Sequence, residues 1–217
     1  MHVENFDRPR LFETAALFGP EFEDRTRFVY HGTSSVYASQ IEVHGWTHPF
    51  HAVDPAELRA LADTLPTDAA ETAETLHNHA ASPTRLSFAA YSFAAVLFAT
   101  TGGGQIVGLC RKAITQGAQP SKTLKELLDR CDGVSGVVYA VDFSEDDLTD
   151  LTFEGMFFHC VGNVDPTRIK AKVEIPSTLM GQELSAINNR PDLYRARLEP
   201  GGLAQRIYYR DQARGAK

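Results

Sequence analysis

Cysteine and long apolar runs are scarce in this 217-residue sequence, and each shortage excludes a class of protein. The 3 cysteines, Cys110, Cys131 and Cys160, are too widely spaced for a disulfide framework or a zinc-ligand pair. No apolar run approaches the roughly eighteen residues that a membrane span needs. The first residues also lack the basic and apolar regions of a signal peptide. We therefore expect buried thiols, no metal, no membrane partner and a cytoplasmic location.

Positive charge is also in short supply, since 21 Lys and Arg residues face 28 Asp and Glu residues, giving a formal net charge of -7. Broad attachment to nucleic acid or anionic lipid rewards a basic surface, so this balance argues against both. A local basic groove stays open, because the C-terminal part leans basic, although solvated surface charge is the ordinary explanation. The arginines concerned are Arg190, Arg195, Arg197, Arg206 and Arg210.

Repeats, low-complexity linkers and breaks in composition are missing too, so we predict a single domain over residues 1–217. In the first part of the chain, strand patterns are separated by helical patterns, and in the later part the strand patterns follow one another closely. This order predicts an α+β fold. Helices are expected within 1–27, 36–44, 54–80 with a break at Pro66, 92–101 with Ser92 as cap, and 106–131 with a break at Pro120. Strands are expected at 28–31, 86–88, 136–143, 156–161 and 169–175, with an edge strand at 207–209.

The most informative stretch is the strand, corner and helix that begin at Phe28. An apolar run ends at His31 and Gly32, a helix follows, and Gly45 closes that helix. A glycine lets the backbone approach a ligand closely, and a histidine beside it can bind that ligand, although such a histidine is more often structural. The aromatic, histidine-rich stretch 46–51 is interpreted as a loop near the same pocket.

Four motifs in order carry a resemblance to a known family. They are Tyr30-His31-Gly32-Thr33, a Ser87-Phe88-Ala89 corner before an alanine-rich helix, a Val138-Tyr139-Ala140-Val141-Asp142 strand, and Glu154 ahead of an apolar strand. In this order they resemble the ADP-ribosyltransferase superfamily, nearest its diphtheria-toxin-like branch, which includes the poly-ADP-ribose polymerases. The likeness covers about residues 28–176 and leaves 177–217 as a C-terminal extension. It implies a split, mostly antiparallel β-sheet core with helical insertions.

The resemblance implies that the first motif, Tyr30 to Thr33, binds NAD as co-substrate. In the family, the histidine that His31 matches hydrogen-bonds the adenosine ribose, and the glycine that Gly32 matches offers its backbone to the nicotinamide amide. Thr33 stands where a hydroxyl adds an amide contact. The chemistry is reasonable, because imidazole can bond a ribose hydroxyl and glycine has no side chain in the way.

The second and third motifs imply the rest of the site. Ser87 stands where the family has a tyrosine or, in the arginine-type branch, a serine. An aromatic residue then has to stack on nicotinamide, and the candidates are Tyr91, Phe88 and Phe98. Glu154 matches the catalytic glutamate, whose carboxylate holds a ribose hydroxyl and stabilises the oxocarbenium ion. Glu174 and Glu183 are weaker alternatives for that role.

The implied function is a mono-ADP-ribosyltransferase of the glycosyltransferase class, which moves ADP-ribose from NAD to a macromolecular acceptor, protein or nucleic acid. The resemblance implies a toxin or phage-defence effector as its setting, with a neutralising partner protein. Two alternatives stay open. One is the RNA 2'-phosphotransferase type of the same superfamily, which should show an arginine-bearing site, and the other is a non-catalytic module that binds NAD or ADP-ribose.

Overall fold

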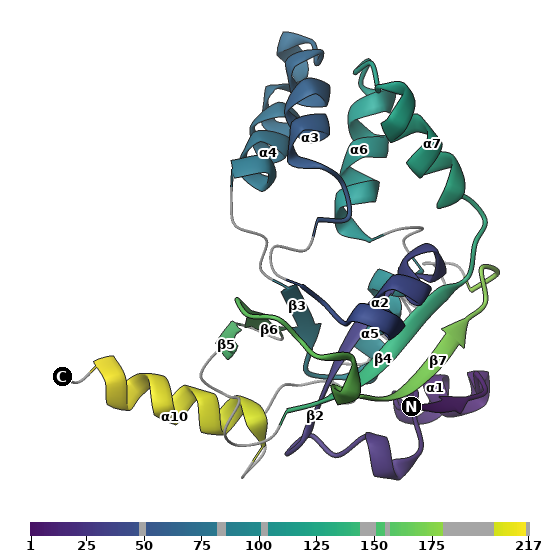
Figure 1. The fold of residues 1–217 in the computed structure, drawn as a ribbon, viewed down its shortest axis with the longest axis vertical. Coiled ribbons are helices and arrows are strands. Elements are labelled where there is room, and N and C mark those ends of the chain that lie inside the picture. The colour runs from purple at the N-terminus through teal and green to yellow at the C-terminus, as the bar shows by residue number, and fades with distance from the viewer. Residues whose placement is uncertain are drawn as a thin grey trace.

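The computed structural model describes residues 1–47, 51–81, 86–100, 104–143, 151–154, 157–179 and 202–215. Seven strands form one sheet in the order β1-β7-β4-β2-β3-β6-β5, and all neighbours run antiparallel except β1 and β7 (Figure 1). The mixed α+β class and the mostly antiparallel sheet are therefore confirmed. The strands are β1 His2–Glu4, β2 Phe28–Ser34, β3 Leu86–Ala89, β4 Gly136–Asp142, β5 Leu151–Glu154, β6 Phe157–Cys160 and β7 Ile169–Ile175.

The helices follow the spacing of apolar residues in the sequence. Asp54 caps α3 by accepting a hydrogen bond from the Ala56 N–H, and Pro55 occupies the first helical position, as predicted. The helices are α1 Arg8–Thr14, α2 Ala38–His44, α3 Pro55–Asp63, α4 Ala70–Ala81, α5 Ser92–Ala99, α6 Gln105–Thr115, α7 Lys122–Arg130 and α10 Leu203–Gly215. Within the part of the chain that the structure describes, no helix is long and apolar enough to cross a bilayer.

The sheet is divided at one point along its strand order. β2 pairs with β4 through seven residue pairs, from Phe28↔Asp142 to Ser34↔Gly136, whereas β2 pairs with β3 only at Tyr30↔Ala89. The strands β1, β7, β4 and β2 thus form one part, and β3, β6 and β5 form the other. Beyond the single shared pair the two parts diverge, which opens space between β2 and β3.

Helix α5 packs unusually close to one face of β2 and β4, because two glycines lie beneath it. A Cβ atom on Gly32 would lie 1.8 Å from the Ala95 carbonyl oxygen, and one on Gly136 would lie 2.3 Å from the Ala99 carbonyl oxygen. This face of the sheet and the apolar side chains of α5 form one hydrophobic core. Gly32 therefore has a packing role in the fold, whatever it does for a ligand.

The opposite face of the sheet is covered by α2, Trp46 and the start of α10, which form a second core. Leu203 and Ile207, one helical turn apart, are buried there, while Tyr208 and Tyr209 are exposed. The predicted edge strand at 207–209 is wrong, because the apolar residues of this segment recur with the period of a helix and not with that of a strand.

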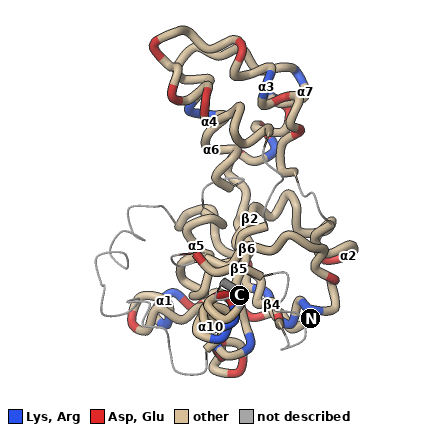
Figure 2. Tube along the Cα trace, turned by 90° about the vertical axis from the view of Figure 1, so that its left-hand side faces the viewer, with Lys and Arg blue, Asp and Glu red and all other residues tan. Residues whose placement is uncertain are grey.

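Helices α3, α4, α6 and α7 pack around a third core of their own, and we call this group the helical lobe. Figures 1 and 2 show the lobe projecting beyond one end of the sheet. The chain enters the lobe twice, near Ala52 before α3 and near Gly104 before α6, and both residues line the space between β2 and β3. The prediction of a single domain stays a prediction.

Two further predictions need correction. Ser92 is not the cap of α5, because Tyr91 occupies the N-cap position and the Ser92 hydroxyl donates to Glu23 Oε1 at 2.6 Å. β2 does not end at His31 but continues to Ser34, since its pairing with β4 extends that far. The strand β5, which ends at Glu154, was not predicted at all.

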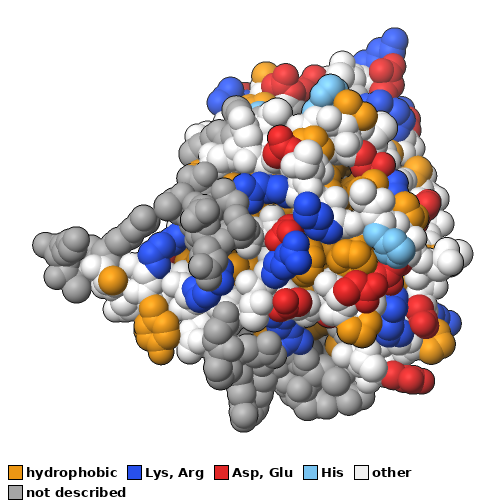
Figure 3. Space-filling view, turned by 60° about the horizontal axis from the view of Figure 1, so that its bottom comes forward, with side chains coloured by type: hydrophobic (Ala, Val, Ile, Leu, Met, Phe, Trp, Pro, Cys, Tyr) orange, Lys and Arg blue, Asp and Glu red, His pale blue; other side chains and the backbone are white. Residues whose placement is uncertain are grey.

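Basic and acidic side chains are mixed on one face of the molecule. Figure 3 shows Lys and Arg side chains gathered on one face, interspersed with Asp and Glu. Arg210 donates from Nη2 to the Leu151 carbonyl at 2.6 Å and also bonds Asp211, so its charge is engaged within the fold. Of the other four predicted basic positions, Arg206 lies on α10, and Arg190, Arg195 and Arg197 lie outside the described residues.

Candidate functional site

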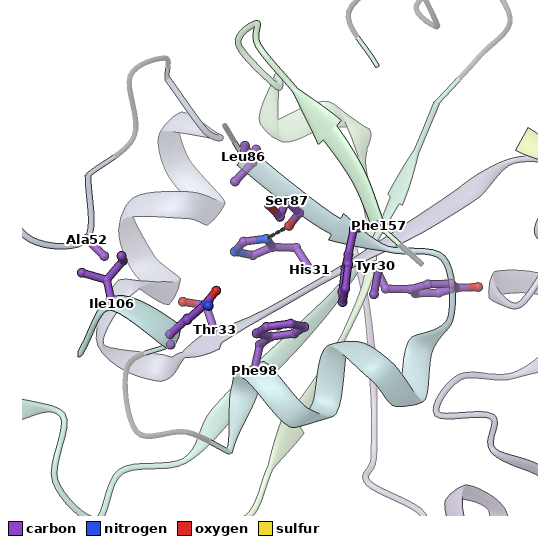
Figure 4. A pocket seen from close by; sticks show the side chains of 13 residues that line it. Tyr30, His31, Thr33, Ala52, Leu86, Ser87, Phe98, Ile106 and Phe157 are labelled. Carbon is purple, nitrogen blue, oxygen red and sulfur yellow. Dashed lines mark hydrogen bonds between the residues drawn. The ribbon is translucent and has the colours of Figure 1, made fainter. Parts of the chain in front are cut away.

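A pocket lies where β2 and β3 diverge, between the sheet, the end of α5 and the start of α6 (Figure 4). Six of the eight residues expected to bind a cofactor line it, namely Tyr30, His31, Gly32, Thr33, Ser87 and Phe98. The remaining lining residues are Ala52, Leu86, Ala89, Gly104, Gln105, Ile106 and Phe157. Residues far apart in the sequence thus meet at the division of the sheet.

The His31 ring occupies the wedge between the diverging strands. Its edge packs against Trp46 and Phe88, with ring centroids 5.0 and 5.6 Å away. Its Nδ1 lies 3.0 Å from the Ser87 carbonyl oxygen, and because a carbonyl only accepts, Nδ1 must carry the hydrogen. Burial lowers the pKa of His31 to about 4, so the ring is neutral at pH 7 and its Nε2 is an acceptor. The fold therefore fixes both the charge and the tautomer of this side chain.

Tyr30 and Thr33 contribute to the pocket in different ways. The Tyr30 hydroxyl donates to the Phe22 carbonyl at 2.8 Å, and Figure 4 shows it directed away from the pocket. Only the inner part of Tyr30 is thus available to a ligand. Thr33 is buried and lies on β2 beyond His31, where the strands have already separated.

The side chains of Phe98 and Phe157 form an apolar wall of the pocket, which we call the phenyl wall. Phe98 from α5 and Phe157 from β6 pack edge to face with centroids 5.6 Å apart, and both line the pocket. The other aromatic candidates lie elsewhere. Phe88 is buried in the core on the opposite face of the sheet, and Tyr91 is buried under the Arg25 guanidinium, 4.3 Å from its ring centroid. Neither of these two is among the pocket's lining residues.

A chain of polar side chains runs from the pocket to the edge of the sheet. Ser87 Oγ lies 3.0 Å from His159 Nδ1, and His159 Nε2 lies 3.9 Å from Glu154 Oε2. The pairing of β3 with β6 places Ser87 directly opposite His159. Glu154 ends β5 with its side chain 80% exposed, and it is paired with Phe157, so it stands at the rim and not in the lining.

His159 and Phe157 were not recognised in the sequence. The available signal was the alternation in the strand 157–160, where Phe158 and Cys160 are buried and the intervening positions face the other side. Of the alternative glutamates, Glu174 lies on β7 and accepts from the Ser135 hydroxyl at 2.5 Å. β7 is separated from β2 by β4 in the sheet. Glu183 is outside the described residues.

The pocket is apolar and uncharged in its lining. None of its described lining residues is Lys, Arg, Asp or Glu, and its polar groups are His31, Thr33, Ser87 and Gln105 with the neighbouring backbone. Elsewhere in the described ranges, no group of three or more His, Cys, Asp or Glu side chains is arranged to hold a metal ion. The arrangement suits a ligand that offers a flat ring to the phenyl wall and hydrogen-bond donors to His31.

Comparisons with protein-family models, with curated proteins and with solved structures found no match for this chain.

Proposed function

We propose that this protein is an NAD-dependent mono-ADP-ribosyltransferase and that its pocket takes NAD, with His31 bound to the adenosine ribose and the two phenyl rings against nicotinamide. The observation that carries the proposal is His31, whose Nδ1 is tied to the Ser87 carbonyl at 3.0 Å in the divided sheet. This bond leaves Nε2 as a neutral acceptor for a ribose hydroxyl. The four motifs that resemble the ADP-ribosyltransferase superfamily give the proposal its chemistry.

The phenyl wall supports the nicotinamide part of this proposal. The nicotinamide ring of NAD is flat and carries a positive charge, so it is attracted to the faces of aromatic rings, where the π-electrons lie. Of the three aromatic candidates, Phe98 is kept, and Phe157 takes the place of Tyr91 and Phe88, because Phe98 and Phe157 line the pocket and the other two do not. A lining without Lys or Arg also avoids repulsion of that cation.

Bond cleavage would begin with the departure of neutral nicotinamide, which takes the electron pair of its bond to ribose C1'. Positive charge then develops on the ribose ring, and the Glu154 carboxylate at the rim would stabilise it. An acceptor oxygen or nitrogen would form the new bond to C1' and release its proton to solvent. The acceptor, protein or nucleic acid, approaches from the side of β5 in this proposal, because Glu154 ends that strand.

A non-catalytic module that binds NAD or ADP-ribose is the second candidate, and the 80% exposure of the Glu154 side chain favours it. A carboxylate in contact with solvent is screened and stabilises a developing cation less well than a buried one. The RNA 2'-phosphotransferase alternative is weaker, because it calls for arginines in the site and the described lining has none.

The deciding experiment measures nicotinamide release from NAD by the wild-type protein, Glu154→Gln and Glu174→Gln. Glu174 is a matched control, because it is also an exposed strand glutamate but lies on β7. We expect Glu154→Gln to lower the rate by about 100-fold, as removal of a charge-stabilising group does, and Glu174→Gln to leave it unchanged. Equal release by the wild type and Glu154→Gln would remove Glu154 from its role. Binding of NAD without release by any of the three would establish the binding module.

Acceptor class and cellular setting follow from a second experiment. Radiolabelled NAD is incubated with the protein and a cell lysate, and the labelled products are then digested with nuclease or with protease. Loss of label from macromolecules after nuclease alone would identify nucleic acid as the acceptor. Loss after protease alone would identify protein. Growth arrest on expression, relieved by Glu154→Gln, is the result expected of a toxin or phage-defence effector.

A further inference from the structure

A row of polar side chains crosses the second part of the sheet. Ser87 on β3 pairs with His159 on β6, and His159 pairs with Thr152 on β5. The intervening residues on the other face are apolar and buried. Since successive residues of a strand face opposite sides, the polar row shares its face with Ala89 and Phe157, which line the pocket. The buried residues on the opposite face include Leu86, Phe88, Leu151, Phe158 and Cys160.

The direction of the hydrogen bond between Ser87 Oγ and His159 Nδ1 depends on the tautomer of His159. Glu154 Oε2 lies 3.9 Å from His159 Nε2, which is beyond hydrogen-bond distance, so the negative charge of the carboxylate acts on the ring through space. It therefore favours the tautomer of neutral His159 that carries its hydrogen on Nε2. His159 Nδ1 is then a lone pair, and at 3.0 Å it accepts the hydroxyl hydrogen of Ser87. Because a hydroxyl has one hydrogen, the lone pairs of Ser87 Oγ are what remains for a ligand.

We propose that His159 is a positioning residue that holds the Ser87 hydroxyl as a hydrogen-bond acceptor toward the pocket, with Glu154 holding the His159 tautomer. His31, whose Nδ1 is bound to the Ser87 carbonyl, then supplies a second acceptor, Nε2, to the same pocket. Two acceptors in one pocket suit a ligand with two hydrogen-bond donors, such as the hydroxyls of a ribose. The choice of ribose rests on the proposed function, whereas the orientation of Ser87 does not.

Protonation of His159 reverses this arrangement. Ser87 on β3 and Thr152 on β5 are paired with His159, and the carboxylate of Glu154 on β5 lies 3.9 Å from its Nε2. A proton on Nδ1 would donate to Ser87 Oγ, and the hydroxyl hydrogen would turn toward the ligand. The pocket would then offer one donor and one acceptor to a diol. Affinity for such a ligand should therefore fall as pH drops, while His31 stays neutral until about pH 4.

The first test needs no ligand. The full chain is labelled with ¹⁵N-histidine, and the tautomers are read from long-range ¹H–¹⁵N spectra near pH 7.5, with His31→Asn and His159→Asn assigning the two rings. We expect His159 with hydrogen on Nε2 alone and His31 with hydrogen on Nδ1 alone. A His159 ring that carries hydrogen on Nδ1 at this pH would overturn the proposal.

The second test measures NAD affinity between pH 5.5 and 8 for the wild type, His159→Asn, His159→Phe and Thr152→Val. Asparagine keeps an acceptor oxygen in the place of Nδ1 but does not titrate, so it should bind within threefold of the wild type and lose the pH dependence. His159→Phe should bind about tenfold more weakly, as loss of one oriented hydrogen bond does. Thr152→Val is the control for a change in the polar row itself and should match the wild type.

The outcomes separate this proposal from the proposed function. If His159→Phe binds NAD with wild-type affinity and an unchanged pH profile, the positioning role of His159 is overturned. This holds even if the protein releases nicotinamide from NAD. A wild-type protein that binds no NAD would remove the proposed function, and the tautomer spectra alone would then decide the role of His159.

Discussion

A methyl group on Gly32 should disturb the fold before it disturbs any ligand. In Gly32→Ala the new Cβ would lie 1.8 Å from the Ala95 carbonyl oxygen, 1.2 Å inside the 3.0 Å limit that real Cβ contacts essentially never pass. The obstacle is helix backbone, which cannot rotate away as a side chain can. Either α5 or β2 must therefore move by more than an ångström. Overpacking typically costs about 1–3 kcal/mol, and we expect the upper end of that range here.

The assay is thermal or urea unfolding of Gly32→Ala beside Gly136→Ala and Gly108→Ala. For a chain of this size, about 3 kcal/mol corresponds to a fall of roughly 6–12 °C in Tm. Gly136→Ala meets the same helix, with its Cβ 2.3 Å from the Ala99 carbonyl oxygen, and should behave alike although Gly136 does not line the pocket. Gly108 lies within α6 with nothing near its Cβ position, so Gly108→Ala should stabilise by about 0.5–1 kcal/mol. Wild-type stability of Gly32→Ala would refute the packing role.

Three further predictions concern pH and the phenyl wall. Because the pKa of His31 falls from 6.5 unfolded to about 4 folded, its neutral form stabilises the fold above pH 6.5 and this contribution is lost as pH falls toward 4. This contribution to the free energy of unfolding is up to about 3 kcal/mol. In urea titrations at pH 7.5 and pH 5, the free energy of unfolding should change less between the two pH values for His31→Asn than for the wild type. Burial raises the pKa of Glu23, so its contribution to stability falls as pH rises from about 4.5 through the folded pKa. The stability difference between the wild type and Glu23→Gln should shrink over that range, and a difference that grows would contradict this. Phe98→Ala removes one ring of the phenyl wall and its edge contact with Phe157, so it should weaken NAD binding about tenfold. Calorimetry measures this affinity, and an unchanged value would count against the placement of nicotinamide beside Phe98.

Local patterns were enough to predict most helices and the long strands. The alternation of Lys170, Lys172 and Glu174 with buried residues predicted β7, and the Asp-Pro pair at 54–55 predicted the start of α3. These signals act within a few residues of the chain. The prediction for 207–209 failed because it considered three β-favouring residues alone. Ile207 belongs with Leu203, four positions earlier, to one buried helical face.

The site was harder to predict, because it depends on pairing between distant strands. Ser87 and Phe88 are adjacent and must face opposite sides of β3, so the two could not both present side chains to the same face of the sheet. The Tyr30↔Ala89 pair sets which face of β3 is turned toward the pocket. One residue pair between distant strands gives no pattern that can be recognised in the sequence. His159 was missed for the same reason, since its partner Ser87 is 72 positions away.

The packing and ligand roles of Gly32 are connected through α5. The helix can approach β2 because Gly32 has no side chain, and that approach brings Phe98, near the end of α5, against Phe157 of β6. Displacement of α5 would therefore move Phe98 away from Phe157, even if the backbone of Gly32 did not contact a ligand. Gly136→Ala separates these effects, because it should displace the same helix from outside the pocket. If NAD affinity falls equally in both variants, the glycine of the first motif acts by placing α5. If only Gly32→Ala loses affinity at matched stability, its backbone contacts the ligand directly.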